Sequence, residues 1–189
     1  MAQASSSTLK RYHLQCFCIL DNMGDEAAEW AATLQEWIVD TGYCYAAALA
    51  GHDGNFYAAA PNTDEGWAWV SKEGYKKPCL QEDGVTEVEK DVWEGDGLKH
   101  AMDTGTKPEW GFYLGGNKYN LTNHQKEFED SEQKFVKLFA QKQKGGCVCI
   151  KTAQSIVVGF YDEEKGQTAG NATKAVIDLA VYLQRDCGY

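Results

Sequence analysis

The sequence predicts a mixed α/β fold of the α+β type: a central antiparallel sheet, a helix from each end of the chain on one of its faces, and short helices on the other. Two observations carry this prediction. Apolar segments separated by glycine-containing turns predict hairpins, and segments near both ends show the spacing of amphipathic helices. A length of 189 residues with 43% apolar content provides one hydrophobic core and is short for two.

The first helix is predicted over residues 28–40. Trp30, Leu34, Trp37 and Ile38 recur at the spacing of one helix face, and Gly42 ends the pattern. This spacing alone favours core positions for both indoles. Of the two, we expect Trp37 to be buried and Trp30 to be exposed.

Two hairpins are predicted next. The first joins a mostly buried strand over 43–50 to a return strand over 55–60 through an Asp-Gly turn, and a short helix over 67–72 follows it. The second, between Tyr75 and Trp93, turns at Gln81–Gly84. Its two strands are charged and poor in large apolar groups, and Pro78 suits only an edge strand. This segment is therefore expected to project from the domain as an arm.

The rest of the chain completes the sheet. A closing helix follows, with an apolar stripe at Ala172, Ala175, Val176, Leu179, Ala180 and Leu183. Paired glycines before Cys147 predict a tight turn between two of the strands. The remaining predicted elements are a short helix over 96–103, a strand over 111–119 broken at Gly115-Gly116, and strands over 135–140, 147–152 and 156–161.

Residues 1–22 differ in character from the rest. Their apolar patch is only about five residues long, too short for a signal peptide and far too short for a transmembrane helix. We interpret them as a disordered or non-native leader, either an extension or an alternative start, with the domain proper running from Met23 to Tyr189.

The net charge and the cysteine content reduce the range of functions to consider. A formal net charge of −10 argues against a nucleic-acid groove, which needs clustered lysine and arginine, although a local basic patch leaves phosphoinositide binding open. Seven cysteines without zinc-type spacing favour reduced, buried thiols in a cytosolic protein. Neither a metal site, a cofactor site nor a nucleophile motif is recognisable, so an enzyme is not expected.

Several segments, taken in order, resemble profilins of the apicomplexan type. They are Glu36–Tyr43, Tyr57–Pro61, Leu114–Tyr119, Lys144–Gly146, Ile150–Thr152 and Tyr161–Lys165. The resemblance implies a monomeric, cytoplasmic and cytoskeleton-associated protein that binds monomeric actin, regulates its polymerisation, and holds proline-rich ligands such as formin segments. An adaptor domain that binds proline-rich peptides without actin is the alternative.

The resemblance also implies two sets of site residues. Polyproline II ligands lack backbone donors and present flat rings, so their receptors use indoles and phenols. The matching groove positions are Trp30, Trp37, Tyr57, Tyr182, Leu183 and Tyr189. Thr33 stands where many profilins have a second aromatic residue, and Ala140 and Thr168 stand where they often have basic ones. The implied actin-binding positions are Lys118, Lys142, Gly170, Thr173, Lys174 and Asp178, with Lys76, Lys77, Glu82 and Asp83 of the arm.

Overall fold

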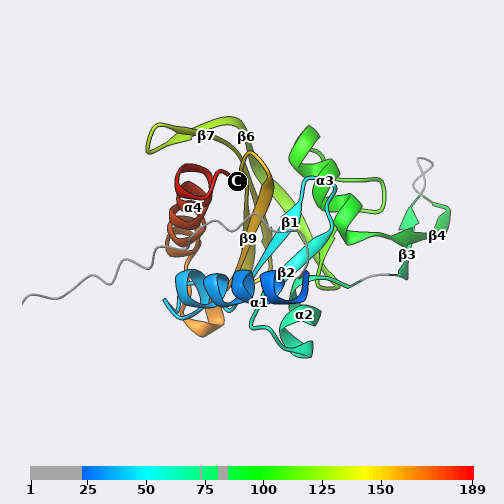
Figure 1. The fold of residues 1–189 in the computed structure, drawn as a ribbon. Helices are drawn as coiled ribbons and strands as arrows, with labels where there is room; N and C mark the ends of the chain where they lie inside the picture. The colour runs from blue at the N-terminus through cyan, green and yellow to red at the C-terminus, as the bar shows by residue number, and fades with distance from the viewer. Residues whose placement is uncertain (1–22, 73, 81–84) are drawn as a thin grey trace, which may run out of the picture.

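The computed structural model describes residues 23–72, 74–80 and 85–189, and its centre is a curled antiparallel sheet (Figure 1). The seven strands lie in the order β2-β1-β9-β8-β7-β6-β5. Their bounds are β1 (Ala46–Gly51), β2 (Phe56–Ala60), β5 (Phe112–Leu114), β6 (Asn117–Asp130), β7 (Gln133–Lys142), β8 (Gly145–Lys151) and β9 (Ser155–Asp162). The leader, residues 1–22, lies outside the described residues.

Helices cover both faces of this sheet. On one face lie α1 (Met23–Leu34), its π-helical continuation Gln35–Val39, and α4 (Ala169–Asp186). The other face carries α2 (Asp64–Val70) and α3 (Glu94–Thr104). Strand β1 shows why two cores form: Ala47 and Leu49 pack toward the terminal helices, and the alternate alanines pack toward the other face. The predicted fold class is confirmed.

Helix α4 packs closely against the middle of the sheet because β9 has a glycine there. A Cβ atom on Gly159 would lie 2.4 Å from Val176 Cγ2 and 3.2 Å from Cys44 Sγ. The helix therefore rests almost directly on the backbone of β9. This contact fixes the position of α4, which carries candidate residues for both binding surfaces.

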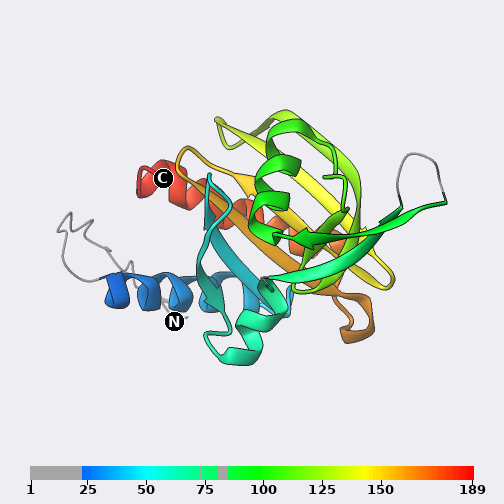
Figure 2. The ribbon, with the colours of Figure 1, turned by 90° about the vertical axis from the view of Figure 1, so that its right-hand side faces the viewer.

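The arm is a separate two-stranded sheet of β3 (Tyr75–Leu80) and β4 (Glu87–Val92), and it stands away from the body (Figure 2). The predicted turn over Gln81–Gly84 lies outside the described residues. One side of the arm contacts the body: the rings of Tyr75 and Tyr113 are 6.3 Å apart, and Lys90 forms an ion pair with Glu109.

A buried carboxylate holds the base of the arm. Glu94, only 1% exposed, accepts four hydrogen bonds of 2.7–2.8 Å. The Tyr75 hydroxyl and the Gly116 N–H donate to Oε1, and the Lys72 and Gly115 N–H groups donate to Oε2. The arm, the end of α2, the start of α3 and the turn between β5 and β6 therefore meet at one side chain.

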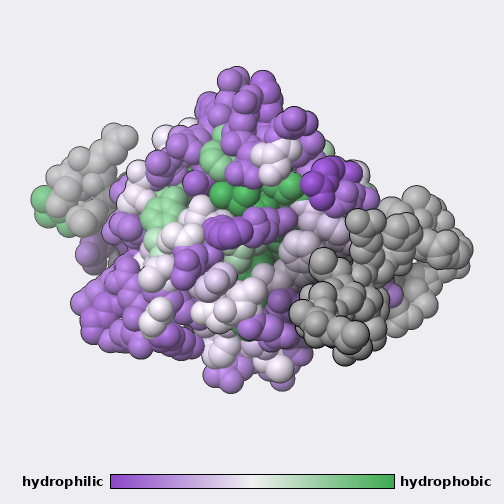
Figure 3. Space-filling model, turned by 90° about the vertical axis from the view of Figure 1, so that its left-hand side faces the viewer, coloured by the Kyte–Doolittle hydropathy of each residue, from purple (hydrophilic) through white to green (hydrophobic). Residues whose placement is uncertain are grey.

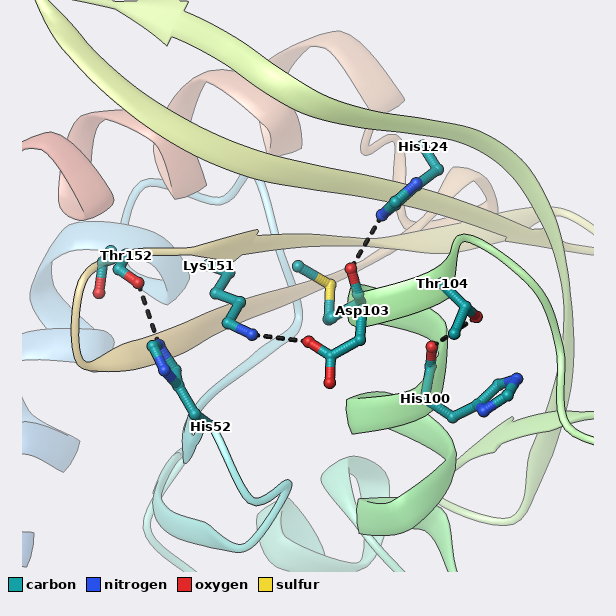
Figure 4. A network of polar contacts seen from close by, with 8 residues as sticks. His52, His100, Asp103, Thr104, His124, Lys151 and Thr152 are labelled. Atoms are coloured by element: carbon teal, nitrogen blue, oxygen red, sulfur yellow. Dashed lines mark hydrogen bonds and ion pairs between the residues drawn. The ribbon is translucent and has the colours of Figure 1, made fainter.

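The C-terminal end of α3 is fixed to the sheet by polar contacts (Figure 4). Lys151 Nζ lies 2.7 Å from Asp103 Oδ1, and His124 Nε2 lies 2.9 Å from the Met102 carbonyl oxygen. On the neighbouring turns, His52 Nε2 lies 3.0 Å from the Thr152 carbonyl oxygen. The contacts of Asp103 and Met102 therefore add to the buried side chains of Leu98, Ala101 and Met102 in holding α3 on the sheet.

Three local predictions were wrong. The break predicted at Gly115-Gly116 is confirmed, since it separates β5 from β6, but β6 does not end at 119 and runs on to Asp130 through a polar segment. The short helix predicted over 67–72 spans Asp64–Val70, because Thr63 caps it by accepting a hydrogen bond from the Gly66 N–H. At the tight turn before Cys147, Lys144 has the positive φ of 57° and the paired glycines belong to β8.

Candidate functional site

An aromatic pocket lies where α1 meets the C-terminal residues. The rings of Trp30 and Tyr189 meet edge to face with centroids 5.0 Å apart. Together with Tyr57 of β2 they border a cavity of about 390 Å³. Its other lining residues are Glu26, Ala27, Gln154 and Ser155.

A second aromatic pair extends this surface along α1. Trp37 and Tyr182 stack with centroids 4.8 Å apart and ring planes inclined by 27°. Trp37 lies in the π-helical segment, where the Asp40 N–H donates to the Gln35 carbonyl oxygen at 2.8 Å. Trp37 follows Trp30 by seven positions, which corresponds to about 10 Å along a helix, close to one turn of a polyproline II helix at about 9 Å. We call the surface formed by both pairs and Tyr57 the aromatic groove.

Hydroxyl groups supply polar contacts in the groove. Tyr57 Oη lies 2.8 Å from Ser155 Oγ, and burial raises the pKa of Tyr57 to about 12. Burial also raises the pKa of Tyr182. Both phenols therefore keep their protons at neutral pH and can donate to a ligand carbonyl. Tyr189 donates from its hydroxyl to Glu26 Oε1 at 3.4 Å, and its N–H to the Leu183 carbonyl oxygen at 3.0 Å.

The structure brings five of the six predicted groove residues together at the surface. Leu183 is the exception, because it is fully buried in the core beneath the groove and presents no surface to a ligand. The prediction for the two indoles is also wrong. Trp37 is 37% exposed, whereas Trp30 is half-buried because Tyr189 packs against it. Thr33 donates its hydroxyl to the Glu29 carbonyl oxygen and adds no ring.

Apolar surface gathers at the centre of the face seen from the side of α4 (Figure 3). Hydrophilic side chains surround this centre. An apolar centre with a polar margin is the usual anatomy of an interaction surface.

A second candidate surface lies around Tyr45, at the start of β1. The ammonium group of Lys165 lies 4.6 Å from the Tyr45 ring centroid and 5.3 Å from that of Trp69. Lys142 approaches the same phenol at 5.8 Å. Neither lysine forms an ion pair among the described residues, so aromatic faces alone hold both cations. Of these residues, only Lys142 was predicted.

The other predicted actin-binding residues are spread over several elements. Gly170, Thr173 and Lys174 lie in the first half of α4, and Asp178 follows at its middle, where it forms an ion pair with Lys174 at 2.6 Å. Lys118 is exposed on β6. In the arm, Lys76 is exposed, and Lys77 lies 5.8 Å from the Tyr113 ring centroid. Glu82 and Asp83 lie outside the described residues.

A family model described as Profilin matches residues 28–189 of the chain. The chain belongs to the profilin family. A profilin of Plasmodium falciparum (isolate 3D7) is 32% identical over 167 residues, covering 84% of this chain and 96% of the relative.

Solved profilin structures share the fold. Profilin II of Acanthamoeba castellanii matches with a TM-score of 0.59 and 24% identity, covering 85% of this chain and 99% of that one. Mouse profilin IIa, solved in complex with a double repeat from the FH1 domain of mDia1, matches with a TM-score of 0.50 and 16% identity over 82% of this chain and 99% of that one. Profilins are actin-binding regulators, and this family membership supports a binding protein rather than an enzyme.

No helix in the part of the chain that the structure describes is long and apolar enough to cross a membrane.

Proposed function

We propose that this profilin binds actin monomers, regulates their polymerisation in the cytoplasm, and holds proline-rich segments such as those of formins in the aromatic groove. The observation that carries the groove assignment is the spacing of its two aromatic pairs. Indoles seven positions apart along a helix, which corresponds to about one polyproline II turn, with protonated phenols beside them, suit a ligand of stacked prolines and free carbonyls. The FH1 repeat bound to mouse profilin IIa supports this ligand class.

The groove is tested with Trp30→Ala. A polyproline peptide of about ten residues is expected to change the tryptophan fluorescence of the parent protein. The substitution is expected to cost about 2 kcal/mol of binding, the size of an interface hot spot. Trp93→Ala is the matched control, since Trp93 is 49% exposed at the start of α3, which lies on the opposite face of the sheet from α1. Equal peptide affinity in the parent and Trp30→Ala would remove Trp30 from the site.

For actin, we propose a surface that joins the first half of α4 to Lys142, Lys165 and the arm. Two lysines held on aromatic faces, without carboxylate partners among the described residues, are available to acidic groups of a partner. A pyrene-actin polymerisation assay tests the assignment: the protein is expected to slow spontaneous polymerisation. Retention on immobilised polyproline with no effect on actin would instead support the adaptor alternative.

A further inference from the structure

Helix α1, which forms one side of the aromatic groove, is acidic. No lysine or arginine occurs between Arg11 and Lys72, so α1 and its continuation carry only acidic charges. The carboxylates of Glu26, Glu29 and Glu36 are exposed, and none of them has an ion-pair partner among the described residues. The side of the groove formed by α1 is therefore negatively charged.

One of these carboxylates lines the cavity, and each of the other two belongs to the residue directly before an indole of the groove. Glu26 lines the cavity and accepts the hydrogen bond of Tyr189, one helical turn before Trp30. Glu36 directly precedes Trp37 at the other pair. The ten steps from Glu26 to Glu36 correspond to about 15 Å along a helix, so these two residues stand near opposite ends of the helix segment that carries both indoles.

Among the described residues, the side chains that line the cavity include no positive charge to offset this one. Its remaining lining residues, Tyr57, Gln154 and Ser155, are neutral. Arg185, near the end of α4, is paired with Asp186 at 2.9 Å and leaves that pair neutral. The negative potential is consistent with the pKa of Tyr57, which is raised mainly by burial and further by Tyr189 and Glu26.

We infer that the groove selects proline-rich segments carrying lysine or arginine at either end of the proline run, and that Glu26, Glu29 and Glu36 make this selection. The inference rests on the proposed polyproline binding. Proline rings carry no charge and cannot form ion pairs with these carboxylates, whereas a flanking lysine or arginine can. Long basic side chains at the ends of a six-proline run, about 19 Å long, reach the carboxylates from the row of rings.

The test compares three peptides, hexaproline flanked at both ends by arginine, serine or glutamate, with decaproline as the reference ligand. Titration calorimetry at low salt is expected to give about fivefold to tenfold tighter binding for the arginine peptide than for the serine peptide, since each exposed ion pair contributes a modest factor. About 1 M NaCl is expected to remove the difference, because screening then acts within about 3 Å.

The variant for this test is E26Q/E29Q/E36Q, which keeps the hydrogen-bond acceptor that Tyr189 uses. Its matched control is E87Q/E89Q/D91N, which removes three exposed charges from β4 of the arm, away from the groove. The first variant is expected to bind the arginine and serine peptides equally, while the control keeps the preference for arginine.

Two results would overturn the inference and leave polyproline binding in place. One is decaproline binding with equal affinities for the arginine and glutamate peptides. The other is a preference for arginine that survives in E26Q/E29Q/E36Q, because the overall charge of −10 would then be its source. If neither decaproline nor any flanked peptide bound, the proposed groove itself would be refuted, and the inference with it.

Discussion

Replacing Glu94 with glutamine tests whether one buried carboxylate holds the base of the arm. Each carboxylate oxygen accepts two hydrogen bonds, and glutamine replaces one of these oxygens with a donor. An amide nitrogen at the Oε2 position would face two backbone N–H groups. At the Oε1 position it faces one N–H group, of Gly116, and the Tyr75 hydroxyl, which can rotate to accept. The second orientation therefore costs less.

Even that orientation leaves the Gly116 N–H without an acceptor. A buried polar group without a partner costs about 1–3 kcal/mol, and replacing charge-assisted hydrogen bonds with neutral ones adds about 1 kcal/mol. We therefore expect Glu94→Gln to lower the free energy of unfolding by about 3 kcal/mol. For a domain of this size, that corresponds to a fall in melting temperature of about 6–12 °C.

Thermal melting followed by circular dichroism measures this loss, with the exposed Glu87→Gln as the control. Hydrogen exchange at the Lys72, Gly115 and Gly116 amides adds local information: we expect these three amides to lose protection more than amides of β8 or β9. A melting temperature within about 2 °C of the parent, or unchanged protection of these amides, would refute the reasoning.

Further predictions concern other parts of the chain. Replacing Lys76–Asp91 with a short Gly-Ser linker is expected to preserve folding and polyproline binding and to weaken the effect on pyrene-actin polymerisation; unchanged actin binding would contradict it. Starting the protein at Met23 is expected to leave the melting temperature within about 2 °C, and a larger fall would show that the leader packs on the domain. Gly159→Ala is expected to destabilise the domain by about 1–3 kcal/mol in denaturant titration, since its Cβ would overlap Val176. Asp103→Asn is expected to lower the free energy of unfolding by about 0.5 kcal/mol at pH 7 and by nothing near pH 2. The hydrogen bond from Lys151 lowers the pKa of Asp103 in the folded protein. The stabilisation is therefore present above the ordinary pKa of aspartate and is lost as the pH falls through the lowered pKa. An equal loss at both pH values would exclude this ion pair as the cause.

The elements that the sequence predicts well are those whose side chains enter a core. Strands β1, β8 and β9 consist almost entirely of buried residues, and the closing helix has a continuous apolar stripe. Strand β6 was not predicted beyond Tyr119 because its side chains are mostly exposed and alternate poorly. Its pairing with β7 arises from tertiary structure and includes two irregularities in register, after Leu121 and after Gln125.

The candidate surfaces were predictable only in part. The groove residues followed from a resemblance, but the sequence could not show which rings pair. Tyr182 stacks on Trp37, and Tyr189 turns back to Trp30, because the chain after α4 hydrogen-bonds to Leu183 and Gln154. The contact of Lys165 with Tyr45 and Trp69 joins three segments, and no local pattern marks it.

Helix α4 carries residues of both proposed binding surfaces, one set near its start and the other near its end. Gly170 and Thr173 lie in its first turn and a half, and Tyr182 lies near its end. Twelve residues from Gly170 to Tyr182 correspond to about 18 Å along a helix. Because the close packing at Gly159 fixes the helix on the sheet, neither surface needs to move for the other to be used. Under the proposed assignments, the actin monomer and the proline-rich segment therefore occupy separate parts of one fixed helix, so we expect both ligands to bind at the same time.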